Sequence, residues 1–422
     1  MHLITKHIIT TFLILSSICV VQAQDEGCDE VIRLNPDMNA DADDDIISIP
    51  PFINLDANVI ESNGADWNAL RHKAASTITV PLSIVHIGDS HIQADFATGH
   101  TRRLFQKNYG NPGRGLIIPF RMTGTNEPRD YLIKSSDTWK GSKLMKQSPD
   151  LPVGFTGVAV APSSRSTDLV ISTLSRTGNK ELFNDVTLYC DGTPVIDSIT
   201  SEGKPLDYEV LSSPGACTVM LARAVSELKL SLSSADATVI YGADLRLSGQ
   251  SGVLYHAIGN NGATYASYSY VNNFADRLSV LNPDLVIISL GANEAFGKTG
   301  SEDIYRAIDA VVNGIMEANP LSEILLVTPM ECQKSTRTRK NRRARGFVVN
   351  DKIAVMREAI LRYGRDKNIA TYDWYSVAGG KGISSKWVGE GLMAKDRIHH
   401  SHKGYLLNGQ LFYEALNKAL TQ

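Results

Sequence analysis

Five stretches of the chain are almost continuously apolar, and segments with helical spacing of apolar residues follow them. These stretches are residues 82–88, Val253 to Ile258, Leu285 to Leu290, Ile324 to Val327 and Ile369 to Tyr372. Parallel strands that are covered on both faces have this pattern. The alternation predicts an α/β fold with a doubly wound, mainly parallel five-stranded sheet, in which sites form at the carboxyl ends of strands.

Two helices are expected to pack against this sheet. Residues 91–107 would form a helix beginning beside Ser90, where its N-terminus would favour developing negative charge. The stripe that predicts this helix has spacings of four and consists of Ile92, Phe96, His100 and Leu104. A terminal helix would place Leu407, Leu411 and Ala415 on one face.

Residues 118–248 change to a period of two, with turn residues between short runs. Leu228, Leu230 and Leu232 alternate there with Lys229, Ser231 and Ser233. Alternation of this kind is typical of half-buried strands. We therefore predict an inserted all-β, sandwich-like domain at 118–248, which divides the α/β domain into 78–117 and 249–422. The insert would serve as a binding module or as a structural lid.

The first residues read as an export signal. Lys6 supplies a positive start, an apolar run extends from Ile8 to Val21, and Val21-Gln22-Ala23 forms a small-residue cleavage site. We expect 1–23 to be a signal peptide, 24–77 an Asp-rich, loop-rich arm, and the mature protein to be periplasmic or secreted. The run is shorter than a membrane span requires, so we expect no stable membrane insertion.

Composition and charge narrow the function classes further. The 422 residues are 43% hydrophobic and 21% charged, with a net charge of −3. This is an ordinary globular composition, and its near-neutral balance argues against a dedicated nucleic-acid binder.

Four cysteines follow the signal peptide, too few for a disulfide framework in so large a chain. If one bridge forms, Cys190 to Cys217 is the expected local pair.

Gly88-Asp89-Ser90 lies at the end of the first apolar strand. A serine in this place can act as a nucleophile if a base, a group that orients the base, and oxyanion donors are close to it. The same tripeptide is common in turns, because glycine tolerates unusual dihedrals while aspartate and serine form local hydrogen bonds. The motif alone leaves both interpretations open.

Two later strand ends carry groups that could stabilise an oxyanion. Gly259-Asn260-Asn261-Gly262-Ala263 follows the second strand, and Gly291-Ala292-Asn293-Glu294 follows the third. Glycine lets the backbone approach a ligand closely and present an N–H, and an asparagine amide can donate to a developing charge. A plain turn and a capping asparagine are the alternatives.

Near the C-terminus, Asp396 precedes His399 by three positions. This spacing would bring the carboxylate to one imidazole nitrogen and leave the other to face Ser90. With His400 and His402 close by, a metal cluster or an exposed loop are other interpretations. No carboxylate or cysteine set at metal-ligand spacing accompanies these histidines, so we predict no metal and no cofactor.

Taken in order, these four motifs resemble the four blocks of the SGNH (GDSL-type) hydrolase family. They are the serine of Gly-Asp-Ser, a glycine after the second strand, the asparagine of Gly-x-Asn and a late Asp-x-x-His. The resemblance implies that Ser90 is the nucleophile, His399 its base and Asp396 the group that orients the base. It spans nearly all of residues 82–422.

The same resemblance implies an oxyanion hole made by the N–H groups of Ser90 and Gly262 and the side chain of Asn293, with Gly259 as the less favoured donor. Within the family, the stretches at 88–91, 259–263 and 291–297 are similar to the peptidoglycan O-acetylesterases. That group also carries a β-rich module between the first and second blocks.

Three positions depart from the broad family pattern. His91 replaces a leucine, Glu294 stands where many members have aspartate, and Arg397 replaces a usual glycine. The first two fit the peptidoglycan O-acetylesterases, and the sequence offers no reason for the third.

The implied function is a serine esterase that removes O-acetyl groups from a cell-wall polysaccharide, most naturally peptidoglycan. An acetyltransferase or an esterase for another polysaccharide such as xylan would use the same residues. A glycan-binding wall protein with an inert site is the alternative outside enzymology. A basic run from Lys334 to Arg345 is either a solvated loop or a surface that attracts anionic polymer.

Overall fold

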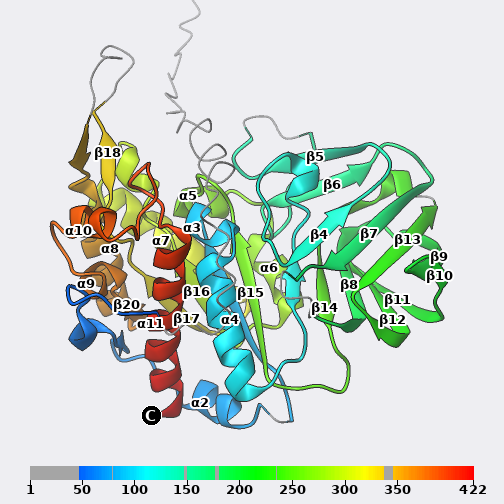
Figure 1. Cartoon of the computed structure of the whole chain (residues 1–422), viewed down its shortest axis with the longest axis horizontal. Coiled ribbons are helices and arrows are strands. Elements are labelled where there is room, and N and C mark those ends of the chain that lie inside the picture. The colour runs from blue at the N-terminus through cyan, green and yellow to red at the C-terminus, as the bar shows by residue number, and fades with distance from the viewer. Residues whose placement is uncertain (1–46, 78, 147–149, 176–179, 234, 337–345) are drawn as a thin grey trace, which may run out of the picture.

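The computed structural model describes residues 47–422, except 78, 147–149, 176–179, 234 and 337–345. An α/β body and a β-rich module lie side by side (Figure 1). The expected signal peptide at 1–23 lies outside the described residues, as does all of the basic run from 337 to 345.

A six-stranded sheet forms the centre of the α/β body. Its strands lie in the order β1-β20-β17-β16-β2-β15. Their bounds are Ile60–Glu61 for β1, Ala370–Tyr372 for β20, Glu323–Val327 for β17, Leu285–Ser289 for β16, Leu82–Gly88 for β2 and Val253–Gly259 for β15. All pairs are parallel except β1 with β20. β2 lies between β15 and β16, and after β15 the chain crosses to β16 on the other side of β2. Such a switch point is where open α/β sheets form their sites.

The five apolar stretches became the five parallel strands, but the prediction of a five-stranded sheet was one strand short. The missing strand is β1, which belongs to the expected arm and pairs antiparallel with β20, Ile60 opposite Tyr372. Two residues are too few to show any periodicity. The described part of the arm also contains α2 (Asn68–Ala75) and buries Trp67 and Leu70 in the core of the α/β body.

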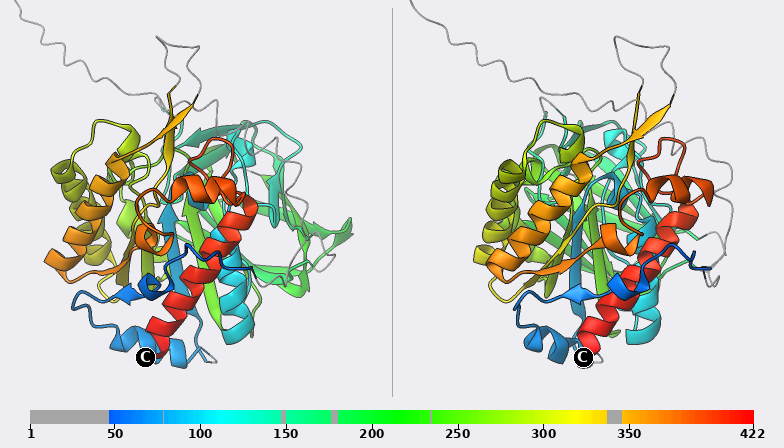
Figure 2. Two further views of the ribbon diagram at one scale, coloured as in Figure 1. Left: turned by 60° about the vertical axis from the view of Figure 1, so that its left-hand side comes forward. Right: turned by 90° about the vertical axis from the view of Figure 1, so that its left-hand side faces the viewer.

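Helices cover both faces of this sheet, as Figure 2 shows. On one face α4 (Phe96–Tyr109) and α11 (His402–Thr421) pack against each other. On the other, α7 (Ser301–Ala318) packs against α8 (Lys352–Lys367) and α5 (Tyr265–Ser269). As expected for a terminal helix, the stripe of α11 at Leu407, Leu411 and Ala415 is buried.

The helix expected at 91–107 is divided in two, and of its predicted stripe only Ile92 is buried. A four-residue helix α3 (Ser90–Gln93) ends before Asp95, which has a φ of 55°, and α4 begins only afterwards. The second helix therefore does not continue the phase of the first. Its buried positions include Thr98, Thr101, Arg102 and Phe105, whereas Phe96, His100 and Leu104 are only half-buried.

The insert consists of two sheets that enclose a hydrophobic cluster of their own. One has the order β10-β9-β13-β7-β4, and the other the order β11-β12-β8-β14-β6-β5, with β3 paired to β14. The bounds are Gly115–Ile117 (β3), Tyr131–Lys134 (β4), Trp139–Lys143 (β5), Val158–Pro162 (β6), Thr167–Thr173 (β7), Phe183–Asp191 (β8), Val195–Ser201 (β9), Lys204–Pro205 (β10), Tyr208–Ser213 (β11), Ala216–Val225 (β12), Glu227–Ser233 (β13) and Val239–Arg246 (β14). Leu228, Leu230 and Leu232 point into this cluster. Since β3 pairs with β14, the β-sheet structure begins at 115, slightly before the expected boundary at 118.

Cys190 and Cys217, named as the local pair in case one bridge forms, are both buried free thiols. In the pairing of β8 with β12, Cys217 lies opposite Leu188, so the two cysteines are offset by two positions along the strands. Diagonal neighbours of this kind have Cβ atoms roughly 7 Å apart or somewhat less, whereas a disulfide needs about 4 Å.

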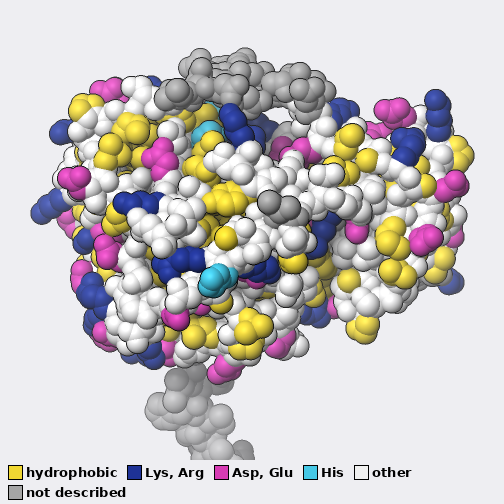
Figure 3. Space-filling model, turned by 90° about the horizontal axis from the view of Figure 1, so that it is seen from below, with side chains coloured by type: hydrophobic (Ala, Val, Ile, Leu, Met, Phe, Trp, Pro, Cys, Tyr) yellow, Lys and Arg dark blue, Asp and Glu magenta, His cyan; other side chains and the backbone are white. Residues whose placement is uncertain are grey.

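Acidic and basic side chains are interspersed over both parts of the molecule on the face that Figure 3 shows. Within the described residues, no helix combines the length and the apolar character that crossing a bilayer requires.

Candidate active site

The nucleophile segment is a sharp turn from β2 into α3. A side chain at Gly88 would collide with Ile92 and with the carbonyl of Ser289, so only glycine lets α3 pack this closely on the strand ends. Asp89 caps the helix by accepting a hydrogen bond from the His91 N–H at 2.9 Å. Ser90, the first residue of α3, is 8% exposed.

The structure brings together three of the residues that the sequence singled out. Ser90 Oγ lies 2.8 Å from His399 Nε2, and His399 Nδ1 lies 2.6 Å from Asp396 Oδ2. With Nδ1–H donating to the carboxylate, Nε2 is left unprotonated to accept the serine proton. This is the arrangement of a nucleophile, a general base and the group that orients the base.

Local hydrogen bonds fix Asp396 in this position. Its Oδ1 accepts from the N–H groups of Ile398 at 2.9 Å and His399 at 3.0 Å. Burial tends to raise the pKa of this carboxyl, but the hydrogen bond and charge of His399, together with these N–H groups, hold the pKa below its ordinary value. Asp396 is therefore a carboxylate under neutral conditions and can stabilise a positive charge on His399.

Gly262 has a backbone conformation that favours glycine. Its φ is +78°, which residues with a side chain rarely adopt. Within the described part of the chain, the N–H groups of Ser90 and Gly262 have no protein acceptor. Gly259 has another role, because a Cβ there would collide with the backbone of Gln93 in α3. Close packing of α3 on β15 explains this glycine.

Asn293 links the first three motifs. Its Nδ2 donates to Asp89 Oδ2 at 3.1 Å and to the Ala263 carbonyl at 3.0 Å. The amide thus lies between the neighbour of Ser90 and the neighbour of Gly262. Both N–H bonds already have protein acceptors, so donation to an oxyanion requires Asn293 to share or exchange one of them.

Two buried carboxyl groups flank this asparagine. Burial raises the pKa of Asp89 to about 6, although the His91 N–H and the charge of His399 oppose the shift. Burial also raises the pKa of Glu294 to about 7, against hydrogen bonds from the Tyr265 N–H and other backbone groups. Glu294 Oε1 accepts from that N–H at 2.8 Å and so fastens the start of α5 to the Asn293 segment.

His91 and His400 pack beside the triad. The His91 ring lies 5.1 Å from the His399 ring between centroids, and Tyr405 Oη lies 3.2 Å from His91 Nδ1. His400 is buried against Trp387 and is therefore not part of an exposed loop. In the described ranges, no three His, Cys, Asp or Glu side chains are grouped so that they could hold a metal ion.

The structure explains the arginine in the Asp-x-x-His motif. Arg397 has a φ of 58°, a backbone conformation in which glycine is the usual residue. Its guanidinium lies over the Phe347 ring at 4.3 Å and donates to Gln333 Oε1 at 2.9 Å. These contacts offset the conformational cost.

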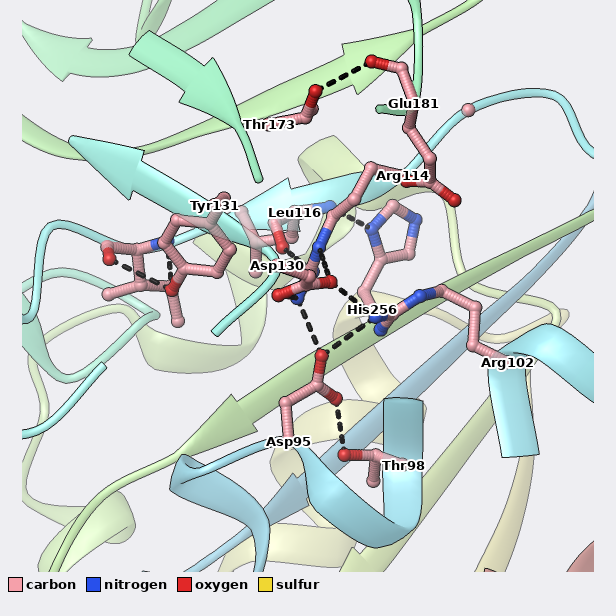
Figure 4. Close-up of polar contacts among 12 residues, drawn as sticks. Asp95, Thr98, Arg102, Arg114, Leu116, Asp130, Tyr131, Thr173, Glu181 and His256 are labelled. Carbon is pink, nitrogen blue, oxygen red and sulfur yellow. Dashed lines mark hydrogen bonds and ion pairs between the residues drawn. The ribbon is translucent and has the colours of Figure 1, made fainter. Parts of the chain in front are cut away.

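A buried ionic cluster beside the nucleophile segment was missed at the sequence level. Asp95 accepts from Arg114 at 2.6 Å and from Arg102 at 2.8 Å, and both arginines also contact Asp130 in the insert (Figure 4). The arginines have no hydrophobic period or motif spacing that would have identified them. Gln93, between Ser90 and this cluster, was missed for the same reason.

Comparisons with known proteins identify the family to which the chain belongs. The model of the GDSL-like Lipase/Acylhydrolase family matches residues 197–407, half of the chain. This match begins within the insert and includes Gly262, Asn293, Asp396 and His399, but not Ser90.

Among solved structures, a peptidoglycan O-acetylesterase is similar with a TM-score of 0.69 and 21% identity, over 85% of this chain and 97% of that one. The structural likeness shows that the two proteins share a fold. A lipase/acylhydrolase from Enterococcus faecalis matches with a TM-score of 0.30 and 20% identity, over 40% of this chain and 77% of its own. A carbohydrate esterase family 3 protein from Talaromyces cellulolyticus matches with a TM-score of 0.29 and 16% identity, over 39% of this chain and 72% of its own. No curated protein matches significantly. The chain belongs to the GDSL-like lipase/acylhydrolase family and is a carboxylic ester hydrolase.

Proposed function

We propose that this protein is an exported serine esterase that removes O-acetyl groups from cell-wall polysaccharide, with O-acetylated N-acetylmuramic acid of peptidoglycan as its substrate. The observation that carries the chemistry is the 2.8 Å contact between Ser90 Oγ and His399 Nε2, backed by Asp396. The apolar run and cleavage site at 1–23 support export.

In the acylation step, Ser90 Oγ attacks the acetyl carbonyl carbon while His399 Nε2 takes the hydroxyl proton. The N–H groups of Ser90 and Gly262 and the amide of Asn293 would stabilise the negative oxygen of the tetrahedral intermediate. The carbon–oxygen bond to the sugar then breaks, and His399 returns its proton to the departing sugar oxygen. Acetyl-serine remains.

In the deacylation step, water attacks the acetyl-serine carbonyl and gives its proton to His399. The bond to Ser90 Oγ breaks, acetate leaves, and the proton returns to the serine. Asp396 keeps His399 in the productive tautomer throughout and stabilises the imidazolium that forms twice per turnover.

The substrate assignment has two supports. The first is the motif resemblance at 88–91, 259–263 and 291–297. The second is the likeness to a peptidoglycan O-acetylesterase over 85% of the chain, more than the α/β body alone would supply.

The experiment is a side-by-side acetate assay with the wild type and Ser90→Ala. O-acetylated peptidoglycan and acetylated xylan are offered at equal ester content. We expect serine-dependent acetate release that is faster from peptidoglycan. Faster release from xylan would overturn the substrate assignment, and equal activity of Ser90→Ala would overturn the mechanism.

A further inference from the structure

The two residues that precede Gly262 are both held by the insert. Asn260 Nδ2 donates to the Thr156 carbonyl at 3.0 Å. Asn261 Nδ2 donates to Asn126 Oδ1 at 2.8 Å and to Thr125 Oγ1 at 3.2 Å. The loop that presents one expected oxyanion donor is therefore positioned from outside the α/β body.

Gln93 connects this loop to the nucleophile helix. It lies three residues after Ser90 in α3 and is 3% exposed. Its Oε1 accepts from the Asn261 N–H at 2.7 Å, and its Nε2 donates to the Asn126 carbonyl at 2.8 Å. Asn126 Oδ1 lies 2.9 Å from the same Nε2. One buried amide thus joins the nucleophile helix, the oxyanion loop and the insert.

A second connection lies just beyond the C-terminal end of this helix. Asp95, two positions after Gln93, is bound by Arg114, which also contacts Asp130 of the insert (Figure 4). The helix that bears Ser90 is thus attached to the insert at its last residue and again two residues beyond it.

We infer that Gln93 is a positioning residue that sets the Gly262 N–H relative to Ser90, with Asn126 of the insert as its partner. The inference rests on the proposed function. Its physical reason is that oxyanion donors act only when they are aimed before the reaction, and a shift of about 1 Å can cost on the order of a hundredfold in rate. On this view the insert completes the catalytic geometry.

The test uses a small aryl acetate, which separates catalysis from polymer binding. We expect Gln93→Ala and Asn126→Ala each to lower kcat by roughly ten- to a hundredfold with little change in KM. Asn126→Asp keeps the Oδ1 acceptor that Gln93 and Asn261 use and should retain most of kcat. The double alanine variant should have a kcat only slightly below that of either single variant, because each single substitution already breaks the same hydrogen-bond network.

The matched control is Gln106→Ala. Gln106 is another buried glutamine, which donates to the carbonyls of Gly113 and Val253 and touches none of the residues around Gly262. A kcat near the wild-type value in this variant, beside the losses above, would support the inference. Wild-type kcat in Gln93→Ala and Asn126→Ala, or an equal loss in Gln106→Ala, would overturn it.

Fluorophosphonate labelling of the wild type separates this result from the proposed function. If the probe labels Ser90 and the untreated wild type hydrolyses the aryl acetate, the mechanism stands. The Gln93 variants then test the positioning role alone. If the wild type neither labels at Ser90 nor hydrolyses the ester, the proposed function fails, and the inference that rests on it fails too.

Discussion

Glu294 offers a prediction whose size follows from its surroundings. The side chain is 4% exposed, and its Oε1 accepts from the Tyr265 N–H. Within the described part of the protein, Oε2 has no hydrogen-bond partner. Burial raises the pKa of this carboxyl from 4.5 to about 7. Folding therefore favours the protonated acid, and ionisation of the folded protein is costly.

The magnitude follows from linkage between protonation and folding. Because the folded pKa lies above the unfolded one, the stability that Glu294 contributes is fully present below the unfolded value and is lost as pH rises through about 7. One pKa unit corresponds to about 1.4 kcal/mol, so the loss is about 3 kcal/mol in the free energy of unfolding at alkaline pH. Glu294→Gln matches the protonated acid in shape and cannot ionise.

The assay is urea unfolding of the wild type and Glu294→Gln at about pH 4 and about pH 8.5. We expect nearly equal stability at the lower pH and a gain of about 3 kcal/mol for the variant at the higher pH. Glu317→Gln, at an exposed position of α7, controls for the change in net charge. A variant no more stable than wild type at the higher pH would refute the reasoning.

Three further predictions concern the site and its support. Asn293→Ala should lower kcat on an aryl acetate by on the order of a hundredfold or more, and unchanged kcat would remove its amide from the oxyanion hole. Asp396→Asn should lower kcat by on the order of ten thousandfold in steady-state kinetics, because an amide NH2 facing His399 Nδ1 favours the tautomer protonated on Nε2, which cannot accept the serine proton. A loss under tenfold would argue against the orienting role of Asp396. Arg114→Met should lower the free energy of unfolding by about 3 kcal/mol in urea, since it leaves Asp95 and Asp130 with fewer partners, and an unchanged midpoint would show the ionic cluster to be dispensable.

The parts of the fold that sequence could predict are those governed by continuous burial. Strands covered on both faces must be apolar along their length, so β2, β15, β16, β17 and β20 were all visible. Their carboxyl ends share one edge of the sheet, which is why Ser90, Gly262 and Asn293, so distant along the chain, could be expected to meet. The two-residue strand β1 carries no such pattern.

Other features depend on tertiary contacts that no local pattern records. The left-handed conformation of Asp95 divides the nucleophile helix, and its carboxylate is held by Arg102 of α4 and by Arg114, which lies beyond that helix. In the sequence Gln93 has the pattern of an ordinary polar helix residue, and its role follows only from its contact with Asn126 of the insert. The offset of Cys190 from Cys217 likewise depends on strand register.

The central claim is that Ser90 carries the acetyl group during turnover, and trapping that intermediate tests it most directly. The wild-type enzyme is quenched in acid soon after mixing with excess aryl acetate, and its peptides are analysed by mass spectrometry. We predict an acetyl group on Ser90 that is absent from Ser90→Ala and decays as acetate is released. Turnover of the ester with no acetyl group on Ser90, or with one on another residue, would contradict the account.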